Sequence, residues 1–330
     1  MTVHAQAEIS TVDYHTGGEP FRIVTAGVPE IPGDTVLARR EHASAPEVDR
    51  VRRLLCHEPR GHADMYGCFL VPPDDDGAHL GVLFWHKDGY STACGHGTIA
   101  LGVHAVESGL VEADPDGDTD VVVDVPSGRV TARVRRRAGL IEAVTFRNVP
   151  SYVVARDVPV TLAGHGEVAV DVAYGGALYA SVPAAAFGLT VEPGHLTELI
   201  ALGRSVKASL AGHPAARHPE DDRLSGIYGV IFHDELGPAR QRNVTVFADG
   251  EVDRSPCGSG TAARLALLHA GGFTGELTHE SIVGSVFTAR VAGTRGEAII
   301  PEITGMAYRT GAHRFVLDPR DPLGTGFTLR

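Results

Sequence analysis

The stretch CGHGTIA at residues 94–100 recurs as CGSGTAA at residues 257–263, and this repeat decides how the chain is organised. The two copies lie 163 residues apart, one near the middle of each half of a 330-residue chain. The similarity continues upstream, since GVLF at 81–84 falls on VTVF at 244–247 with the same spacing. Several matches in one register indicate an internal duplication, so the two halves should share one fold.

Each half is predicted to contain the same series of elements. A strand surrounds Tyr66 in the first half and Tyr228 in the second, two residues that match with a shift of one position. A further strand ends at Phe84 or at Phe247, and after a turn a helix begins just behind the repeated cysteine. Because strands rich in Val and Thr fill the remainder, we expect an α+β protein with mostly β-structure wrapped around one helix per half.

The two predicted helices are apolar along their length and are each followed by a glycine. Gly109 closes the first helix and Gly271 the second, which is typical of a helix stop. A helix without a polar face belongs in the interior of a domain. We therefore expect both helices to be central and buried.

Length and charge narrow the class of protein. A chain of 330 residues exceeds what one hydrophobic core usually fills, so two domains are expected. The formal net charge of −12 argues against a nucleic-acid partner, because such proteins bind phosphates with clustered Lys and Arg. The one basic cluster, Arg133 with residues 135–137, is interpreted as a solvated strand edge.

The sequence also indicates where the protein is located and which cofactors it could bind. Residues 1–10 lack the basic and apolar segments of a signal peptide, and no apolar run is long enough to span a membrane, so a cytoplasmic protein is expected. Only Lys87 and Lys207 could form a Schiff base with a cofactor such as pyridoxal phosphate. The chain is predicted to use no cofactor and no metal.

The four cysteines fall into two classes. Cys56, Cys68, Cys94 and Cys257 lie far apart without a CxxC motif, so free thiols are expected. Cys56 and Cys68 are predicted to be buried hydrophobic residues of the core. Cys94 and Cys257 recur at the same place of a duplication, which packing alone does not explain. A dinucleotide-binding motif at residues 257–263 is a poorer interpretation, because no strand runs directly into the glycines.

A cysteine at a helix start has a defined chemistry. The unpaired backbone N–H groups and the positive end of the helix dipole favour the thiolate, so a lowered pKa is expected for Cys94 and Cys257. The same N–H groups can bind a carboxylate. If the halves pack with pseudo-two-fold symmetry, one thiol faces each side of a bound amino acid's α-carbon. One thiolate could then remove the α-proton while the opposite thiol returns a proton, inverting the stereocentre without a cofactor.

The sequence resembles the proline racemase family, which includes 4-hydroxyproline 2-epimerase and trans-3-hydroxy-L-proline dehydratase. The resemblance runs through nearly the whole chain and is carried by DYHTGGEP at 13–20 with Arg22, EPRGH at 58–62, residues 90–97, NVP at 148–150, GG at 175–176 and DRSPCG at 253–258. It implies a diaminopimelate-epimerase-like fold of two pseudo-symmetric domains, each a curled sheet or barrel around a central helix. The active site would lie in the cleft between them.

The resemblance also implies roles for single residues. Cys94 and Cys257 resemble the two proton acceptors and donors, and Asp253 resembles the carboxylate that holds the substrate's ring nitrogen. The ligand-contacting residues that follow the cysteines correspond to Gly95, His96, Gly258 and Ser259. We expect an N-terminal domain of residues 1–138 plus 302–330, a C-terminal domain of residues 139–301 and a small-molecule substrate. A homodimer is compatible with this organisation.

Three functions remain open at this point. Cysteine at both places favours a proline racemase or 4-hydroxyproline 2-epimerase, because the family's dehydratases typically have threonine where Cys257 stands. Against this, the segments DMYG at 64–67 and GYST at 89–92 look more like the dehydratase branch. A non-catalytic amino-acid binding protein is the third alternative, which the intact cysteine pair disfavours.

Overall fold

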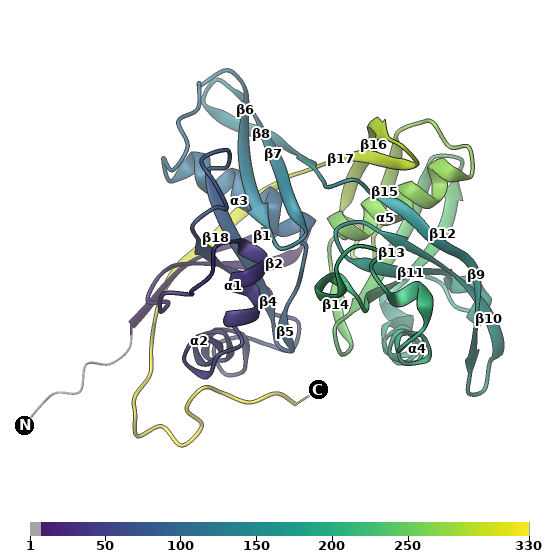
Figure 1. Cartoon of the computed structure of the whole chain (residues 1–330), viewed down its shortest axis with the longest axis horizontal. Helices are drawn as coiled ribbons and strands as arrows, with labels where there is room; N and C mark the ends of the chain where they lie inside the picture. Colours follow the sequence, from purple (N-terminus) through teal and green to yellow (C-terminus); the bar gives the residue numbers. More distant parts are fainter. Residues whose placement is uncertain (1–7, 330) are drawn as a thin grey trace, which may run out of the picture.

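The computed structural model describes residues 8–329 and has two lobes that lie side by side (Figure 1). The first part of the chain folds as β1 (Glu8–Thr16), β2 (Glu19–Ala26), α1 (Val36–His42), α2 (Pro46–Cys56), β3 (Gly67–Val71), β4 (Leu80–His86), β5 (Gly89–Tyr90), α3 (Gly95–Glu107), β6 (Gly117–Val125), β7 (Gly128–Arg137) and β8 (Leu140–Arg147). Strand β4 runs two residues beyond the predicted end at Phe84, which carries His86 to the seam between the lobes.

The second part repeats the series. It consists of β9 (Tyr152–Leu162), β10 (Gly166–Tyr174), β11 (Leu178–Pro183), α4 (Leu196–Ser209), β12 (Ile227–Gly237), β13 (Arg240–Phe247), β14 (Glu251–Asp253), α5 (Gly258–Ala270), β15 (Leu277–Ser281), β16 (Val286–Arg295), β17 (Ala298–Gly305) and β18 (Ala307–Val316). Short 3-10 turns lie at Ala184–Phe187, Pro193–His195, Pro214–Ala216 and Asp222–Leu224.

Strand pairing confirms the duplication at the level of topology. In the first lobe the strands pair in the order β18, β1, β2, β3, β4, β6, β7, β8, with β2–β3 and β4–β6 parallel. In the second lobe the order is β9, β10, β11, β12, β13, β15, β16, β17, with β11–β12 and β13–β15 parallel. In both lobes the parallel pairs are formed by the third and fourth strands and by the fifth and sixth strands of this order. The two halves therefore have the same fold.

The two sheets join through equivalent strands. β8 and β17 hold the same place in their lobes and pair with each other, antiparallel, from Glu302 opposite Arg147 to Gly305 opposite Val144. The C-terminal β18 returns to pair with β1, so the end of the chain completes the first lobe's sheet. The predicted domain boundaries at 138/139 and 301/302 stay a proposal.

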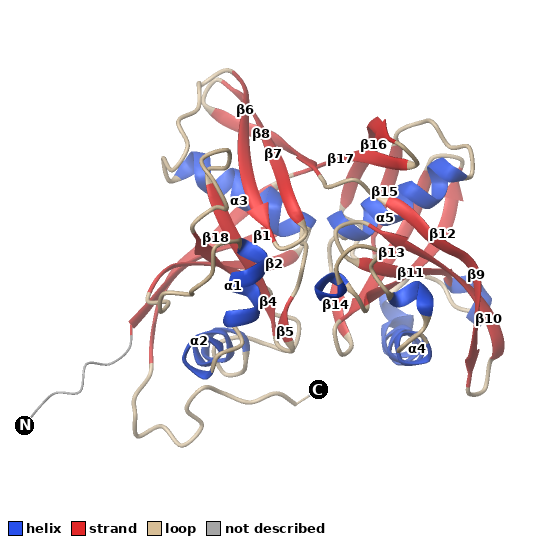
Figure 2. Ribbon diagram, in the orientation of Figure 1, coloured by secondary structure: helices blue, strands red, loops and turns tan. Residues whose placement is uncertain are grey.

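The central helices are buried as expected. Residues 95–105 of α3 and 258–267 of α5 are all buried, and Figure 2 shows the two helices end to end across the middle of the molecule. Gly102 of α3 allows close packing, because a Cβ there would lie 2.8 Å from the Cβ of Ala132 on β7. The glycine stop is confirmed for Gly109, but in the second lobe Gly272, one residue after Gly271, has the left-handed backbone (φ +94°).

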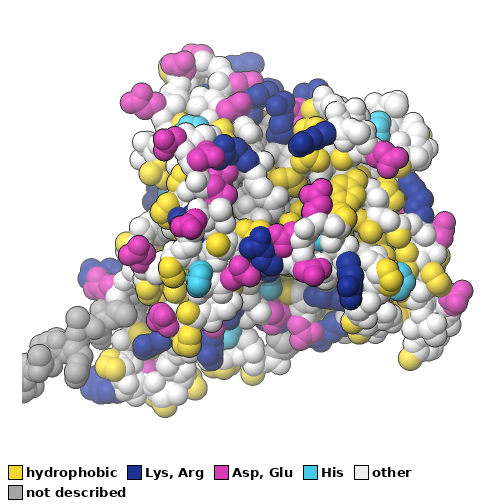
Figure 3. Space-filling view, in the orientation of Figure 1, with side chains coloured by type: hydrophobic (Ala, Val, Ile, Leu, Met, Phe, Trp, Pro, Cys, Tyr) yellow, Lys and Arg dark blue, Asp and Glu magenta, His cyan; other side chains and the backbone are white. Residues whose placement is uncertain are grey.

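The prediction for the basic cluster was wrong in one respect. Arg133 and residues 135–137 lie on β7, which is an inner strand between β6 and β8. The side chains at 133, 135 and 137 are solvent-accessible and pair with acidic residues, whereas Arg136 is partly buried and donates to the Ala113 carbonyl at 2.7 Å. Arg133 pairs with Asp120 at 2.8 Å. On the face drawn in Figure 3, acidic and basic side chains of the described residues are interspersed without a broad basic patch. No helix within residues 8–329 could span a membrane.

Candidate active site

The N-termini of α3 and α5 meet where the two lobes touch. Cys94 is the residue before α3, and Cys257 is the residue before α5. A Cβ built on Gly95 would lie 2.5 Å from Cα of Gly258, and one built on Gly258 would lie 2.6 Å from Cα of Gly95. These separations are too short for any side chain, so glycine at both positions allows the two helix starts, and with them the two thiols, to come together.

Gly95→Ala is expected to keep the lobes from closing. The added methyl group would meet backbone atoms of Gly258 and Ser259 at 2.5–2.8 Å, and backbone cannot move aside as a side chain can. We expect turnover to fall roughly 100-fold, the typical effect of misplacing catalytic groups by about 1 Å. The measurements are substrate turnover and the melting temperature.

Gly293→Ala is the matched control for this variant. Gly293 has open space around it, so its substitution should leave both quantities unchanged. Full activity in Gly95→Ala would mean that the close contact of the helix starts is not needed for catalysis.

Cys94 is held by its own helix and by His96. Its Sγ accepts the Gly97 backbone N–H at 3.2 Å, and it lies 3.5 Å from Nε2 of the His96 ring. The thiol is 4% exposed. Cys94 therefore caps α3 in the way that Ser or Asp commonly caps a helix.

Cys257 has a different backbone from its counterpart. Its φ is +61°, a left-handed conformation that is uncommon for a residue with a side chain, whereas Cys94 is extended at φ −156°. Such strained backbone conformations concentrate at functional sites. The repeat in the sequence is therefore not a repeat in local geometry.

The expectation of a lowered thiol pKa is wrong for this closed structure. Burial, and after it the Asp253 charge, raises the pKa of Cys257, and burial outweighs the Gly97 N–H to raise that of Cys94 well above its usual range. A helix start contributes about 0.3–1 kcal/mol, less than one pKa unit, while full burial can shift a pKa by 3–5 units. A thiolate here needs a positive charge beside it, which a bound ammonium group would supply.

Asp253 places a carboxylate beside His96, where its charge acts on both thiols. Its Oδ1 accepts hydrogen bonds from the Ser255 N–H at 2.8 Å and from the Ser255 hydroxyl at 2.7 Å. Its Oδ2 lies 3.5 Å from Nδ1 of His96. The structure thus brings Asp253, His96 and both cysteines to one buried place, as the resemblance implied.

Ser259 and the neighbouring Gly175 complete the second lobe's side of the site. The Ser259 hydroxyl pairs with the Tyr179 hydroxyl at 2.7 Å. A Cβ on Gly175 would lie 2.3 Å from the Ser259 carbonyl oxygen, so this glycine allows close packing against the start of α5. The predicted residues Gly95, Gly258 and Ser259 therefore all lie at the helix junction.

Sequence analysis missed the hydroxyl groups of the site. Tyr66, Tyr179 and Tyr228 lie near the thiols, since charges on the cysteines contribute to the raised pKa of each phenol, after burial as the main cause. The signal was available for two of them, because Tyr66 and Tyr228 match across the repeat. The sequence pattern by itself predicts only strand positions for them.

Glu19 was also missed. Its side chain is fully buried, its Oε2 accepts the Arg254 N–H at 2.7 Å, and burial followed by the charge of Asp253 raises its pKa well above the usual range. Its place in the GGEP segment was the signal, since that segment carries the resemblance to the family.

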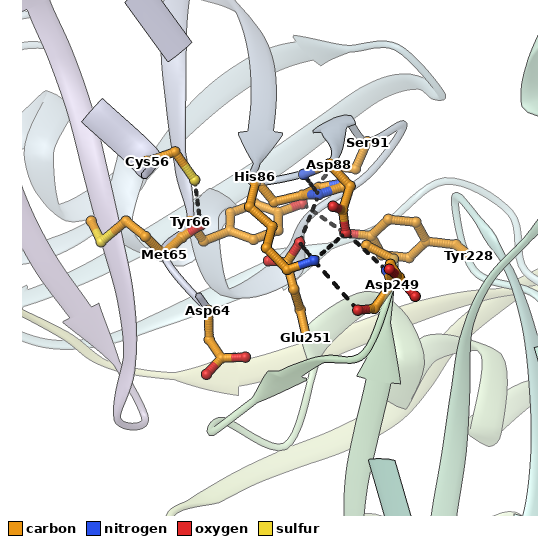
Figure 4. A network of polar contacts seen from close by, with 12 residues as sticks. Cys56, Asp64, Met65, Tyr66, His86, Asp88, Ser91, Tyr228, Asp249 and Glu251 are labelled. Atoms are coloured by element: carbon orange, nitrogen blue, oxygen red, sulfur yellow. Dashed lines mark hydrogen bonds and ion pairs between the residues drawn. The ribbon is translucent and has the colours of Figure 1, made fainter. Parts of the chain in front are cut away.

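Polar contacts close the seam beside the tyrosines (Figure 4). The Asp249 N–H donates to Asp88 at 2.9 Å, and His86 pairs with Glu251 at 3.1 Å, so both contacts join one lobe to the other. His86, Asp88 and Glu251 could together ligate a cation. Lys87 already supplies one, since its ammonium lies 2.7 Å from Asp88 and 4.0 Å from Glu251, so we assign this group to closure.

Comparison with known proteins assigns the chain to a protein family. Residues 11–328 match the family model described as proline racemase. The chain belongs to the proline racemase family. It is 44% identical over 329 residues to a trans-3-hydroxy-L-proline dehydratase of Bacillus thuringiensis subsp. konkukian, covering 97% of this chain and 98% of the relative. It is 45% identical over 335 residues to a 3-hydroxyproline 2-epimerase of Burkholderia multivorans, covering 98% of each.

Solved structures of this family confirm the fold prediction. A hydroxyproline epimerase from Agrobacterium vitis with bound trans-4-hydroxy-L-proline superposes with a TM-score of 0.91 at 35% identity, over 98% of this chain and 96% of that one. A phenazine biosynthesis protein of the PhzF family from Bacillus anthracis shares the fold alone, at 13% identity and a TM-score of 0.58. The family model and these relatives confirm the broad prediction of an enzyme that is either an amino-acid racemase or epimerase, or a dehydratase.

Proposed function

We propose that this protein dehydrates trans-3-hydroxy-L-proline, with a cysteine thiolate removing the α-proton. The contact of the two helix starts carries the proposal, because it puts the thiols of Cys94 and Cys257 at one buried place. The choice of substrate rests on the relatives with 44–45% identity, whose names refer to 3-hydroxyproline and mostly to its dehydration.

The site supplies the groups that this reaction needs. The carboxylate of the amino acid would accept backbone N–H groups at the starts of α3 and α5, where helix dipoles stabilise the negative charge that develops. The ring ammonium would pair with Asp253, and its positive charge would offset the burial that opposes a thiolate. Gly95, His96, Gly258 and Ser259 would form the remaining walls. No cofactor enters these steps.

Loss of water then follows from the substrate's own geometry. The 3-hydroxyl of trans-3-hydroxy-L-proline is opposite the carboxylate, so it lies on the same face of the ring as the α-proton. Protein groups on one face of the ring can therefore both remove the α-proton and assist the departure of the 3-hydroxyl. The product is an enamine that rearranges to a cyclic imine.

Epimerisation at the α-carbon is the second candidate. The specific observation in its favour is Cys257, which places a thiol where it could return a proton from the opposite face. The Burkholderia multivorans relative is named a 3-hydroxyproline 2-epimerase, and the Agrobacterium vitis structure holds trans-4-hydroxy-L-proline. Proline and 4-hydroxyproline therefore stay in the set of substrates to test.

One experiment separates these reactions. The protein is incubated in heavy water with L-proline, trans-4-hydroxy-L-proline and trans-3-hydroxy-L-proline, and products are identified by NMR and chiral chromatography. We expect cyclic imine from trans-3-hydroxy-L-proline alone. Inverted, α-deuterated amino acid would establish epimerisation instead, and binding without exchange would indicate a non-catalytic protein.

The lobes would have to part for substrate to enter, because the thiols are buried in the closed form. We propose that residues 1–138 with 302–330 and residues 139–301 move as two bodies for this purpose. A homodimer and a cytoplasmic location remain predictions from the sequence.

A further inference from the structure

Dehydration requires a group that the thiols and Asp253 do not provide. Hydroxide is a poor leaving group, so the departing oxygen needs a proton as its bond to carbon breaks. In trans-3-hydroxy-L-proline that oxygen lies on the face from which the α-proton is taken. The donor should therefore stand on the same side as the basic thiol and be connected to it.

A chain of hydroxyl groups begins beside Cys94. The Tyr66 ring packs edge-on against the His96 ring, and Nε2 of His96 lies 3.5 Å from the Cys94 Sγ, so Tyr66 belongs to the same buried cluster as the thiol. Tyr66 pairs in turn with the Tyr228 hydroxyl at 3.1 Å and with Ser91. Figure 4 shows Tyr66, Ser91 and Tyr228 drawn together at the seam. Three transferable protons thus lie in one connected row.

The row lies on the Cys94 side of the site. Tyr66 packs against His96, which lies at the start of α3 with its Nε2 3.5 Å from the Cys94 sulfur, and Tyr228 bonds to Tyr66. The third tyrosine, Tyr179, bonds instead to Ser259, which lies at the start of α5 after Cys257. The hydroxyl pair therefore stands where an elimination on one face, begun by Cys94, would need it.

Packing fixes both phenol rings. Tyr66 lies edge-on against the His96 ring at 5.0 Å and against Phe247 at 5.8 Å between centroids. Tyr228 stacks on Phe247 at 5.6 Å. Tyr228 and Ser91 also line a cavity of about 370 Å³ at the seam, so the chain of hydroxyls extends from Cys94 to an open space between the lobes.

Resting on the proposed function, we infer that Tyr66 and Tyr228 relay a proton from Cys94 to the 3-hydroxyl of the substrate as it leaves. The Cys94 thiolate takes the α-proton, and the freed electron pair forms the double bond between the α-carbon and C3 while the C3–O bond breaks. The leaving oxygen takes a proton from Tyr228, Tyr228 takes one from Tyr66, and Tyr66 takes one from the Cys94 thiol. Water and enamine result, and Cys94 is a thiolate again.

The relay works without a free phenolate. Burial raises the pKa of Tyr66 and of Tyr228 well above the usual range, so neither would lose its proton outright. Each gives one proton as it receives another, which keeps both neutral throughout. This is the advantage of two linked hydroxyls over a single isolated one.

The test compares two leaving groups in the full-length protein. Fluoride leaves with far less need of a proton than hydroxide does, so trans-3-fluoro-L-proline bypasses the relay while still needing Cys94. Tyr228→Phe should slow water loss from trans-3-hydroxy-L-proline about 100-fold, the usual effect of losing a general acid. Fluoride release should stay within a small factor of wild type.

Tyr66→Phe should slow both reactions, because Tyr66 also supports the Cys94 thiolate. The matched control is Tyr14→Phe, which removes a buried hydroxyl bonded to Glu107 at 2.9 Å, at the far end of α3 from Cys94. It should change neither rate.

The relay is overturned if Tyr228→Phe slows both substrates equally, since a positioning role would do that, or if it slows neither. Wild-type protein that releases no water from trans-3-hydroxy-L-proline would overturn the proposed function, and the relay with it. Water loss in wild type that persists in Tyr228→Phe would overturn the relay alone. Melting temperatures of all variants identify any that fail to fold.

Discussion

Cys94→Ala is expected to lower α-proton removal by roughly a hundred- to ten-thousand-fold, the range for losing a positioned general base. The thiol of Cys94 is the candidate base in both the dehydration and the epimerisation schemes, so every product should decline together. The measurements are deuterium entry at the α-carbon and formation of the cyclic imine.

The fold of this variant should survive. Loss of the hydrogen bond from Gly97 to Sγ removes a helix cap, which costs about 1 kcal/mol. Cys68→Ala is the matched control, because it also removes a buried thiol but from strand β3 of the core, and it should retain activity. Deuterium exchange at the wild-type rate in Cys94→Ala would remove Cys94 from the mechanism.

Cys257→Ser should divide the two candidate reactions. A serine hydroxyl is a far weaker acid than a thiol, so it returns a proton to the opposite face poorly, and inversion should fall at least about 100-fold. Water loss should change little, because the proposed elimination uses the Cys94 face alone. Serine tolerates the left-handed backbone at this position about as well as cysteine does, so the fold should be kept.

The readout is the ratio of inverted amino acid to cyclic imine. If water loss falls in Cys257→Ser but persists in Cys94→Ala, then Cys257 is the base and the relay through Tyr66 lies on the wrong face. If neither reaction changes, Cys257 takes no part in proton transfer. A melting temperature close to wild type is required for either conclusion.

The polar contacts between the lobes affect which assay suits the two cysteine variants, because they limit access to the buried thiols. The turn after β13 is held by the contact of Asp249 with Asp88, and Arg254 pairs with Asp64 at 2.8 Å, so several polar contacts join the lobes around the thiols. Thiol-modifying reagents should therefore report opening of the lobes as well as thiolate formation. Isotope exchange with substrate measures the chemistry more directly.

The sequence alone determined the duplicated fold and the family. The repeated CG-x-G-T segment fixed the register of the two halves, because glycines at a helix start and the cysteine before it form a local pattern. The buried helices after Cys94 and Cys257 were predicted for the same reason, since apolar composition and a following glycine are local properties. The comparisons confirmed the family that the quoted motifs indicated.

Only the tertiary structure decided the electrostatics and the shared polar network. The thiol pKa prediction failed because burial by the opposite lobe outweighs the helix start, and no local pattern reports how deeply a residue is covered by distant chain. The left-handed backbone of Cys257 and the Tyr66–Tyr228 contact depend likewise on how the two copies meet. Helices and turns follow from neighbours in sequence, whereas desolvation and hydrogen bonds between lobes follow from neighbours in space.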